Sequence, residues 1–334
     1  MVPVLYRQPS LDSMVKRIGH RSTPLMAVST APFSLLAGLA LLLGGCASGN
    51  RVPAKPSEIT VRVDCGVIDG RTGSVLTWDM LLAQLDPADV IVIGEQHDDA
   101  TGHAVQLALV EDLLTDGRGA LAMEMLERDE QALIDDYRDG IIDTETFAKL
   151  TESTDWAGSG SWAAWYQPCV DAAIDQGAAV VAANAPRRYV RTARIDGWTT
   201  IDTLSGPRAE LVDRPDTPIT GSYRERFFEL MGGHGDGQSP DPENMNVVES
   251  FFRSQQVWDA TMAASVSTAL ETAGPPVILL VGRFHSDYEG GTVSQIRRHH
   301  PGAKIRTISL EPACETVELN LEEPQADFVI CTTP

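Results

Sequence analysis

The chain has 334 residues, 43% of them hydrophobic, which is typical of a globular protein with one large or two smaller domains. Its formal net charge of −21 argues against a basic surface for nucleic acid and predicts a soluble, self-repelling body. No phosphate loop, G-x-G-x-x-G, G-x-S-x-G or H-E-x-x-H motif occurs. Nucleotide enzymes and serine hydrolases of the familiar kinds are therefore disfavoured.

The first 45 residues have the pattern of a signal peptide. Basic residues (Lys16, Arg17 and Arg21) precede an apolar run over residues 32–43. The sequence Leu43-Gly44-Gly45-Cys46 resembles a bacterial lipobox, which predicts cleavage before Cys46 and lipidation of its thiol. An uncleaved membrane anchor is the alternative, but the apolar run is short for a spanning helix.

Three segments follow from this pattern: a lipoprotein signal peptide over residues 1–45, a lipidated tether over residues 46–60, and a single domain over residues 61–334. The tether is rich in Gly, Ser, Pro and Lys. Ala47 and Ser48 give no acidic retention signal. We therefore expect a lipid-anchored protein of the bacterial cell envelope that faces the periplasm, at the outer membrane.

Apart from Cys46, the chain has four cysteines: Cys65, Cys169, Cys314 and Cys331. In an oxidising compartment an even number permits two disulfides, in three connectivities. Cys314 and Cys331 flank two predicted strands, over residues 316–321 and 327–330. We therefore expect these two cysteines to pair.

Strands and helices alternate along the body of the chain. Apolar runs predict strands at residues 90–93, 119–125, 178–183, 277–281 and 303–308, and helices at 223–231 and 246–272. Such alternation predicts an α/β fold, a mostly parallel sheet flanked by helices. The irregular segment around residues 205–245, which includes His234 in a Gly-rich loop, predicts a helical cap inserted between two halves.

Each half has a buried strand that ends in a Gly-x-x-His turn. The turns are Gly94-Glu95-Gln96-His97 and Gly282-Arg283-Phe284-His285, and the strand ends also carry Glu124 and Asn184. Right-handed crossovers place the carboxyl ends of parallel strands on one edge, where ligands bind in open α/β sheets. Unpartnered carboxylates are costly to bury. The two turns are therefore predicted to form one site.

Two chemistries suit these residue types. Glu95, His97, Glu124 and His285 could hold a divalent metal such as Zn, Mn or Fe, with Glu95 or Glu124 as base in a hydrolase. Alternatively, His97, His285, Tyr288 or His234 could ligate haem iron while Phe284 packs on the porphyrin.

Structural interpretations compete with these functional ones. Glu124 could form a salt bridge with Arg187 or Arg188, and Asn184 could cap the helix that Pro186 opens. His103 is expected on the exposed side of a helix, and Tyr166 is expected to be a packing aromatic. A non-catalytic envelope scaffold would show no convergence of the strand-end groups.

The motifs from residue 75 to 310 resemble those of the ChaN-like haem-binding lipoproteins, within the Tiki, TraB and erythromycin-esterase-like superfamily. The resemblance rests on Ile93–Asp99, Glu124, Trp162–Cys169, Val181–Arg187, Ser254–Ala263 and Val281–His285. It implies haem binding in iron acquisition, with a homodimer that has haem at its interface. The wider superfamily implies a metal-dependent hydrolase. Phe284 departs from the commoner Gly-x-Gly-His turn.

Overall fold

A computed structural model describes residues 60–232, 242–312 and 320–332. All of them belong to one compact unit, Arg51–Pro334. Every described cluster of buried apolar side chains is therefore built from this unit alone. The predicted signal peptide, Cys46, His234 and Cys314 lie outside the described residues. Among the residues that were described, none of the helices is both long and apolar enough to cross a membrane.

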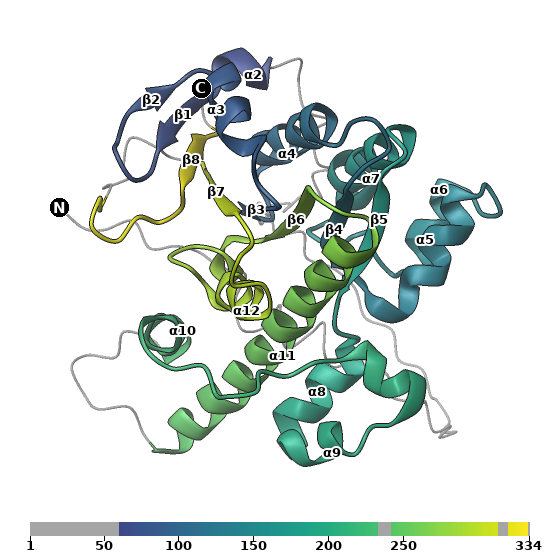
Figure 1. Ribbon diagram of the computed structural model, residues 1–334. Helices are drawn as coiled ribbons and strands as arrows, with labels where there is room; N and C mark the ends of the chain where they lie inside the picture. The colour runs from purple at the N-terminus through teal and green to yellow at the C-terminus, as the bar shows by residue number, and fades with distance from the viewer. Residues whose placement is uncertain (1–59, 233–241, 313–319, 333–334) are drawn as a thin grey trace, which may run out of the picture. The chain divides into compact units, whose positions relative to one another are not determined.

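An eight-stranded sheet forms the centre of the unit, in the order β2-β1-β8-β7-β3-β6-β4-β5 (Figure 1). Its strands are β1 (Gly66–Asp69), β2 (Val75–Leu76), β3 (Val90–Glu95), β4 (Ala120–Glu127), β5 (Ala179–Asn184), β6 (Val277–Gly282), β7 (Ile305–Glu311) and β8 (Phe328–Cys331). The six strands from β8 to β5 run parallel, and β1 is antiparallel to both β2 and β8. The predicted α/β class with a mostly parallel sheet is confirmed.

The central strands are buried on both faces because helices cover both sides of the sheet. Successive side chains of a strand point to opposite faces. Ile91 and Ile93 of β3 accordingly join one apolar cluster, whereas Val90 and Val92 join another. The unbroken apolar runs of the sequence follow from this double burial.

Different helices cover the two faces. The first cluster contains residues of α3 (Trp78–Leu85), α4 (Ala100–Leu113), the π-helix η2 (Trp162–Tyr166) and α7 (Gln167–Asp175). The second contains residues of α11 (Pro242–Thr272) and α12 (Gly291–His299). The short η4 (Arg283–His285) directly follows β6.

Most of the remaining helices lie in the connections that follow β4 and β5. After β4 come η1 (Arg128–Glu130), α5 (Gln131–Arg138) and α6 (Thr144–Leu150); after β5 come α8 (Arg187–Asp196), α9 (Trp198–Asp202), η3 (Gly206–Leu211) and α10 (Ser222–Gly232). The predicted cap segment contains η3 and α10. Tyr223 and Phe227 of α10 pack with Phe252 of α11 and with Phe284.

The apolar patterns of the sequence predict no helix or strand between residues 60 and 89. This segment forms α2 (Val61–Asp64), the β1–β2 hairpin and α3. Strand β2 has only two residues, so it shows no usable alternation. Thr77 caps α3 by accepting a hydrogen bond from the backbone N–H of Met80, 3.3 Å away.

Cys331 takes part in a disulfide, whereas Cys65 and Cys169 are free and buried. The predicted strand over residues 327–330 corresponds to β8. Cys314 and most of the predicted strand at 316–321 lie outside the described residues, so the pairing of Cys314 with Cys331 stays a prediction.

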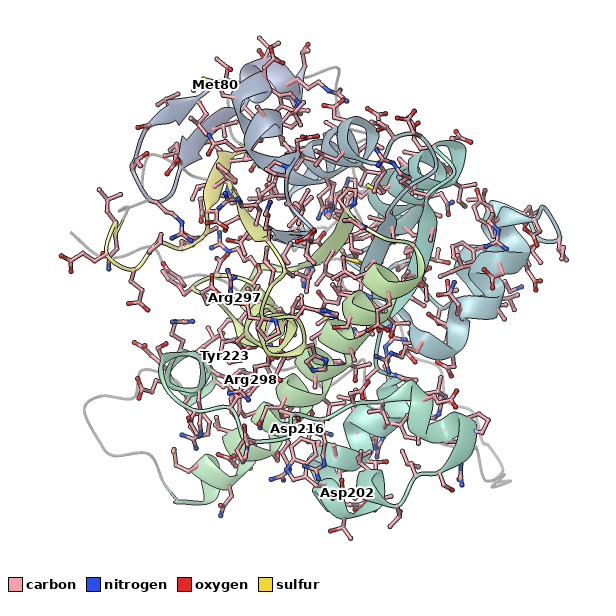
Figure 2. All side chains as sticks on the ribbon, viewed as in Figure 1. Met80, Asp202, Asp216, Tyr223, Arg297 and Arg298 are labelled. Atoms are coloured by element: carbon pink, nitrogen blue, oxygen red, sulfur yellow. The ribbon has the colours of Figure 1, made fainter. Side chains whose placement is uncertain are left out.

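Helix α3 offers a matched test of the core, because Leu81 is fully buried and its neighbour Met80 is 49% exposed. Met80 is labelled in Figure 2. We expect Leu81→Ala to lower the free energy of unfolding by about 2–5 kcal/mol. Met80→Ala should change it by less than about 0.5 kcal/mol. Urea unfolding measures both values. A Leu81→Ala effect as small as that of Met80→Ala would show that α3 is not part of the cooperative core.

Candidate functional site

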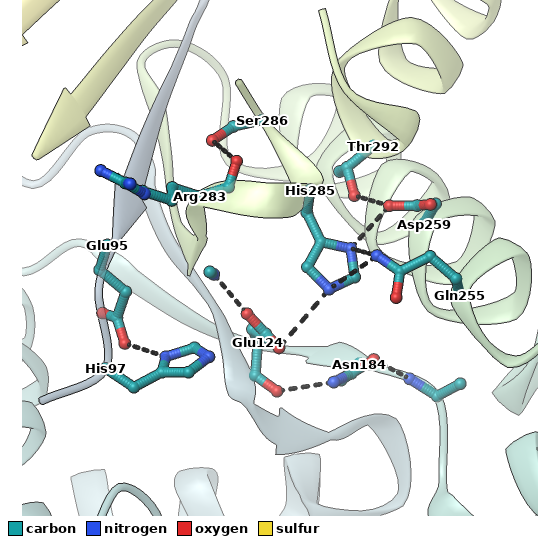
Figure 3. A network of polar contacts seen from close by, with 12 residues as sticks. Glu95, His97, Glu124, Asn184, Gln255, Asp259, Arg283, His285, Ser286 and Thr292 are labelled. Carbon is teal, nitrogen blue, oxygen red and sulfur yellow. Dashed lines mark hydrogen bonds and ion pairs between the residues drawn. The ribbon is translucent and has the colours of Figure 1, made fainter. Parts of the chain in front are cut away.

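The carboxyl ends of β3, β4 and β6 bring the predicted site residues together (Figure 3). Glu95 of β3 pairs in register with Gly282 of β6. The backbone N–H of Gly282 donates a hydrogen bond to Glu124 Oε2 at 2.5 Å. His285 Nε2 lies 3.8 Å from Glu124 Oε1. Figure 3 shows the Glu124 side chain between the imidazoles of His97 and His285.

Glu95 holds His97 in a fixed orientation. His97 Nδ1 lies 2.8 Å from Glu95 Oε1. The Glu95 side chain is almost completely buried, whereas 36% of the His97 side chain is exposed. With Nδ1 held in this way, Nε2 is the ring nitrogen left for a ligand.

Glu95 has three further partners. The Tyr166 hydroxyl donates to Oε1 at 2.7 Å, Gln106 Nε2 donates to Oε2 at 2.6 Å, and His103 Nδ1 lies 3.7 Å from Oε2. Burial raises the pKa of Glu95, but His103, His97 and Tyr166 outweigh it and lower the pKa to about 2. Glu95 is therefore a stable anion beneath His97.

One expectation for this region was wrong. His103 is buried, with its ring stacked on Trp165 at a centroid distance of 4.6 Å. Tyr166 is a buried packing aromatic, as expected, and its hydroxyl also donates a hydrogen bond to the Glu95 carboxylate. Tyr166 ends the π-helix η2, and π-helical turns are frequent at functional sites.

Asp259 of α11 holds the second histidine. His285 Nδ1 lies 2.7 Å from Asp259 Oδ1, and both side chains are buried. The hydroxyls of Thr292 and Tyr223 also donate to the Asp259 carboxylate, at 2.7 and 2.8 Å. No local pattern in the sequence distinguishes Asp259 as a site residue, although the stretch that carries the family resemblance contains it.

The two imidazoles share one electrostatic arrangement. Desolvation lowers the pKa of His97, but the hydrogen bond and charge of Glu95 and the charge of Glu124 outweigh it, so the pKa is raised. The pKa of His285 is also raised, because Asp259 and Glu124 outweigh desolvation. The site is thus two carboxylate–imidazole pairs on either side of Glu124.

Two glycines permit this close packing. A Cβ at Gly282 would lie 2.9 Å from His97 Cε1. A Cβ at Gly291, the first residue of α12, would lie 2.0 Å from Asp259 Oδ2. Real Cβ atoms do not approach other atoms this closely. A side chain at either position would therefore displace one member of a carboxylate–imidazole pair.

The predicted salt bridge of Glu124 and the predicted capping role of Asn184 are both wrong. Arg187 pairs with Glu127 at 3.2 Å and Arg188 with Asp129 at 2.6 Å, so neither holds Glu124. The α8 N-cap is Pro186, and Asn184 instead donates to the Glu124 backbone carbonyl at 2.9 Å. Asn184 thereby ties β5 to β4 at the site.

The remaining predicted haem contacts have other neighbours. The Arg226 guanidinium carbon lies 4.8 Å from the ring centroid of Tyr288, which is 37% exposed. Phe284 packs on Tyr223 and Phe227 at centroid distances of 5.3 and 5.9 Å. The roles of Tyr288, Phe284 and His234 stay predictions.

No group of three or more His, Cys, Asp or Glu side chains is arranged to hold a metal ion within residues 60–232, 242–312 and 320–332. Glu95 and Asp259 instead engage the Nδ1 atoms of the two histidines. The geometry therefore gives no support to Glu95, His97, Glu124 and His285 as a joint metal-ligand set.

Glu95→Gln tests the first pair. This change keeps the shape of the side chain but removes its charge, so the pKa of His97 should fall. An NMR titration of the His97 ring protons measures the pKa. Glu145→Gln on the exposed surface of α6 is the charge-matched control. An unchanged pKa of His97 in Glu95→Gln would contradict the assigned pairing.

The pH dependence of stability tests the second pair. The folded-state pKa of His285 lies above its ordinary 6.5, so between the two values the folded state binds more protons than the unfolded state. This contribution is fully present below pH 6.5 and is lost as pH rises through the folded pKa. Glu130, whose pKa burial raises to about 8, adds a fall of the same sign.

We therefore expect the free energy of unfolding to decrease from about pH 6 to about pH 9, and to decrease less in His285→Gln. Urea unfolding across this range measures the difference between the two proteins. His299→Gln, at the exposed end of α12, should retain the wild-type slope. An equal slope in all three proteins would show that Asp259 does not raise the pKa of His285.

A family model and two solved structures are similar to this chain. A family model described as "Haem-binding uptake, Tiki superfamily, ChaN" matches residues 81–296. One similar solved structure is described as "Cofacial heme binding to ChaN of Campylobacter jejuni". Its TM-score is 0.58 at 21% identity, with 80% of this chain and 96% of that chain covered.

A second structure, of the type III effector HopBA1, has a TM-score of 0.43 at 11% identity, with coverage of 76% and 92%. No curated protein matches the chain. The family model covers well over half of the 334 residues and includes both Gly-x-x-His turns. The chain belongs to the ChaN family of haem-binding uptake proteins, within the Tiki superfamily.

Proposed function

We propose that this chain binds haem at the carboxyl edge of its sheet and serves haem or iron acquisition in the cell envelope. Membership of the ChaN family supports haem as the ligand. The Glu95–His97 pair is the observation that supports His97 as the haem-binding residue. It presents a partly exposed imidazole whose Nδ1 is already held.

His97 fits the role of iron ligand better than His285. The side chain of His97 is 36% exposed, whereas that of His285 is only 9% exposed. A histidine ligand usually bonds a carboxylate through its other nitrogen, which fixes the ring and raises its basicity. Glu95 does this for His97. Haem would supply the iron centre, and the protein would supply orientation and charge.

The surroundings of His97 suit a porphyrin. Trp156 packs edge-on against the His97 ring at a centroid distance of 4.8 Å. An aromatic side chain beside an exposed imidazole offers an apolar contact for a flat macrocycle. We assign Glu124 and His285 to the support of this site, since both influence the charge of His97.

Haem affinity tests whether the two Gly-x-x-His turns share one site. A haemin titration of the Arg51–Pro334 unit, followed in the Soret region, should show saturable binding. His97→Ala and His285→Ala should each weaken binding, with effects in the double variant that differ from their sum by more than about 0.5 kcal/mol. His299→Ala is the control and should bind as the wild type does.

Strictly additive losses would contradict a shared site. If none of the variants changes the affinity, the proposed location of the haem is wrong. Stoichiometric metal in the purified protein, without a Soret shift, would favour the alternative of a metal-dependent hydrolase.

We also propose that the protein is anchored through a lipid on Cys46 and forms a homodimer when haem is bound. The Campylobacter protein is described by its cofacial haem binding. If each chain holds one haem, two haems lying face to face require two chains. The lipobox and the tether over residues 46–60 supply the anchor.

The dimer proposal predicts a change in mass with haem. Sedimentation of the Arg51–Pro334 unit should show a shift from monomer towards dimer as haemin approaches one equivalent per chain. His97→Ala should abolish the shift at the same haemin concentration. A dimer of equal stability with and without haemin would show that dimerisation does not depend on haem binding, which would contradict the proposal.

A further inference from the structure

A cationic pocket lies at the opposite end of the central strands from the histidine site. It has a volume of about 230 Å³, and its lining includes Arg71, Arg297, Lys304 and Arg306. Lys304 directly precedes β7, which pairs with β3 from Val90 onward. The pocket is therefore at the amino ends of these strands, whereas Glu95 and His97 are at the carboxyl end. The two sites are separated by the length of the strands.

The charge of this pocket is opposite to that of the whole protein. Of the eight described residues that line it, four are Arg or Lys and none is Asp or Glu. The chain as a whole has 26 Lys and Arg against 47 Asp and Glu. Four cations around one small cavity repel one another unless an anion screens them. The composition of the lining thus points to an anionic ligand.

Neighbouring carboxylates balance only part of this charge. Buried Asp327 accepts from Arg71 Nε at 2.8 Å, and the same oxygen lies 3.7 Å from Arg306 Nη1. One carboxylate thus faces two guanidinium groups, and it also accepts from the backbone N–H of Thr307 at 3.0 Å. Asp327 fixes the two arginines without neutralising both.

The other two cations differ in their partners. Arg297 Nη2 donates to Glu289 Oε1 at 2.9 Å (Arg297 is labelled in Figure 2). Lys304 is exposed, and its backbone N–H donates to Asp89 Oδ2 at 2.7 Å. Among the residues that the structure describes, no carboxylate lies within ion-pair distance of the Lys304 ammonium. Lys304 is therefore the cation most available to a ligand.

We propose that this pocket binds the phosphate group of a small phosphate-containing ligand. Guanidinium groups match phosphate oxygens in bidentate geometry, and an ammonium adds a point charge. A volume of about 230 Å³ is below that of a pocket for a drug-sized molecule. It suits a phosphate with a short substituent, such as a free phosphate ester or a glycerophospholipid headgroup. The site is independent of the proposed haem site.

Calorimetric titration of the Arg51–Pro334 unit with inorganic phosphate and with glycerol 3-phosphate tests the proposal. We expect saturable binding that weakens as ionic strength rises. Lys304→Gln should weaken it about tenfold, as for the loss of one charge-assisted hydrogen bond, while Lys304→Arg should stay within about threefold. Arg138→Gln, on exposed α5, is the charge-matched control and should have no effect.

Absence of saturable binding by the wild type overturns the proposal, as does an equal loss in Lys304→Gln and Arg138→Gln. Because the Lys304 side chain is exposed, its replacement should leave the urea midpoint and haemin affinity unchanged. Retention of haemin binding by a variant that has lost phosphate binding would show that the two sites are separate.

Flotation with phosphatidylcholine vesicles that contain phosphatidylglycerol distinguishes the two sources of phosphate. Vesicle binding that Lys304→Gln reduces and Arg138→Gln retains supports a lipid headgroup. Binding of glycerol 3-phosphate without vesicle binding supports a free phosphate ester. If both variants reduce vesicle binding equally and the calorimetric titration does not saturate, the vesicle binding is a non-specific electrostatic attraction. This result would overturn the proposed phosphate site.

Discussion

Two imidazoles, each held through Nδ1 by a buried carboxylate, are the arrangement on which the site depends. Glu95 holds His97, and Asp259 holds His285. Both carboxylates are buried, so each needs several hydrogen-bond donors, and these come from helices on opposite faces of the sheet. Tyr166 and Gln106 serve Glu95 from one face, whereas Tyr223 and Thr292 serve Asp259 from the other. The site therefore couples both helical layers to the strand ends.

Much of the fold and half of this site could be predicted from local sequence. The β3 and β6 runs are apolar without interruption because both faces are buried, and a Gly-x-x-His turn follows each. The supporting groups could not be predicted in the same way. Asp259 lies inside a long helix, and its link to His285 exists only after β6 packs beside α11. An amphipathic helix would expose His103 on its solvent face, yet α4 is buried around much of its circumference.

The sheet places different chemistry at its two edges. At the carboxyl edge, buried carboxylates and imidazoles converge between β3, β4 and β6, which is where parallel α/β sheets bind ligands. At the amino edge, arginines and a lysine surround a small pocket beside β7. A protein of net charge −21 thus keeps a local cationic site that is remote from its histidines. The domain could engage haem at one edge and a phosphate group at the other without competition.

The central claim is that His97 Nε2 binds haem iron while Glu95 holds Nδ1. Resonance Raman spectroscopy of the reduced haem complex tests this most directly, because it detects the stretching vibration of an iron–imidazole bond. The band should be present in the wild type and in His285→Ala, absent in His97→Ala, and restored in His97→Ala by added imidazole. A band that persists unchanged in His97→Ala, or a tyrosinate signature in the ferric wild-type complex, would contradict this assignment.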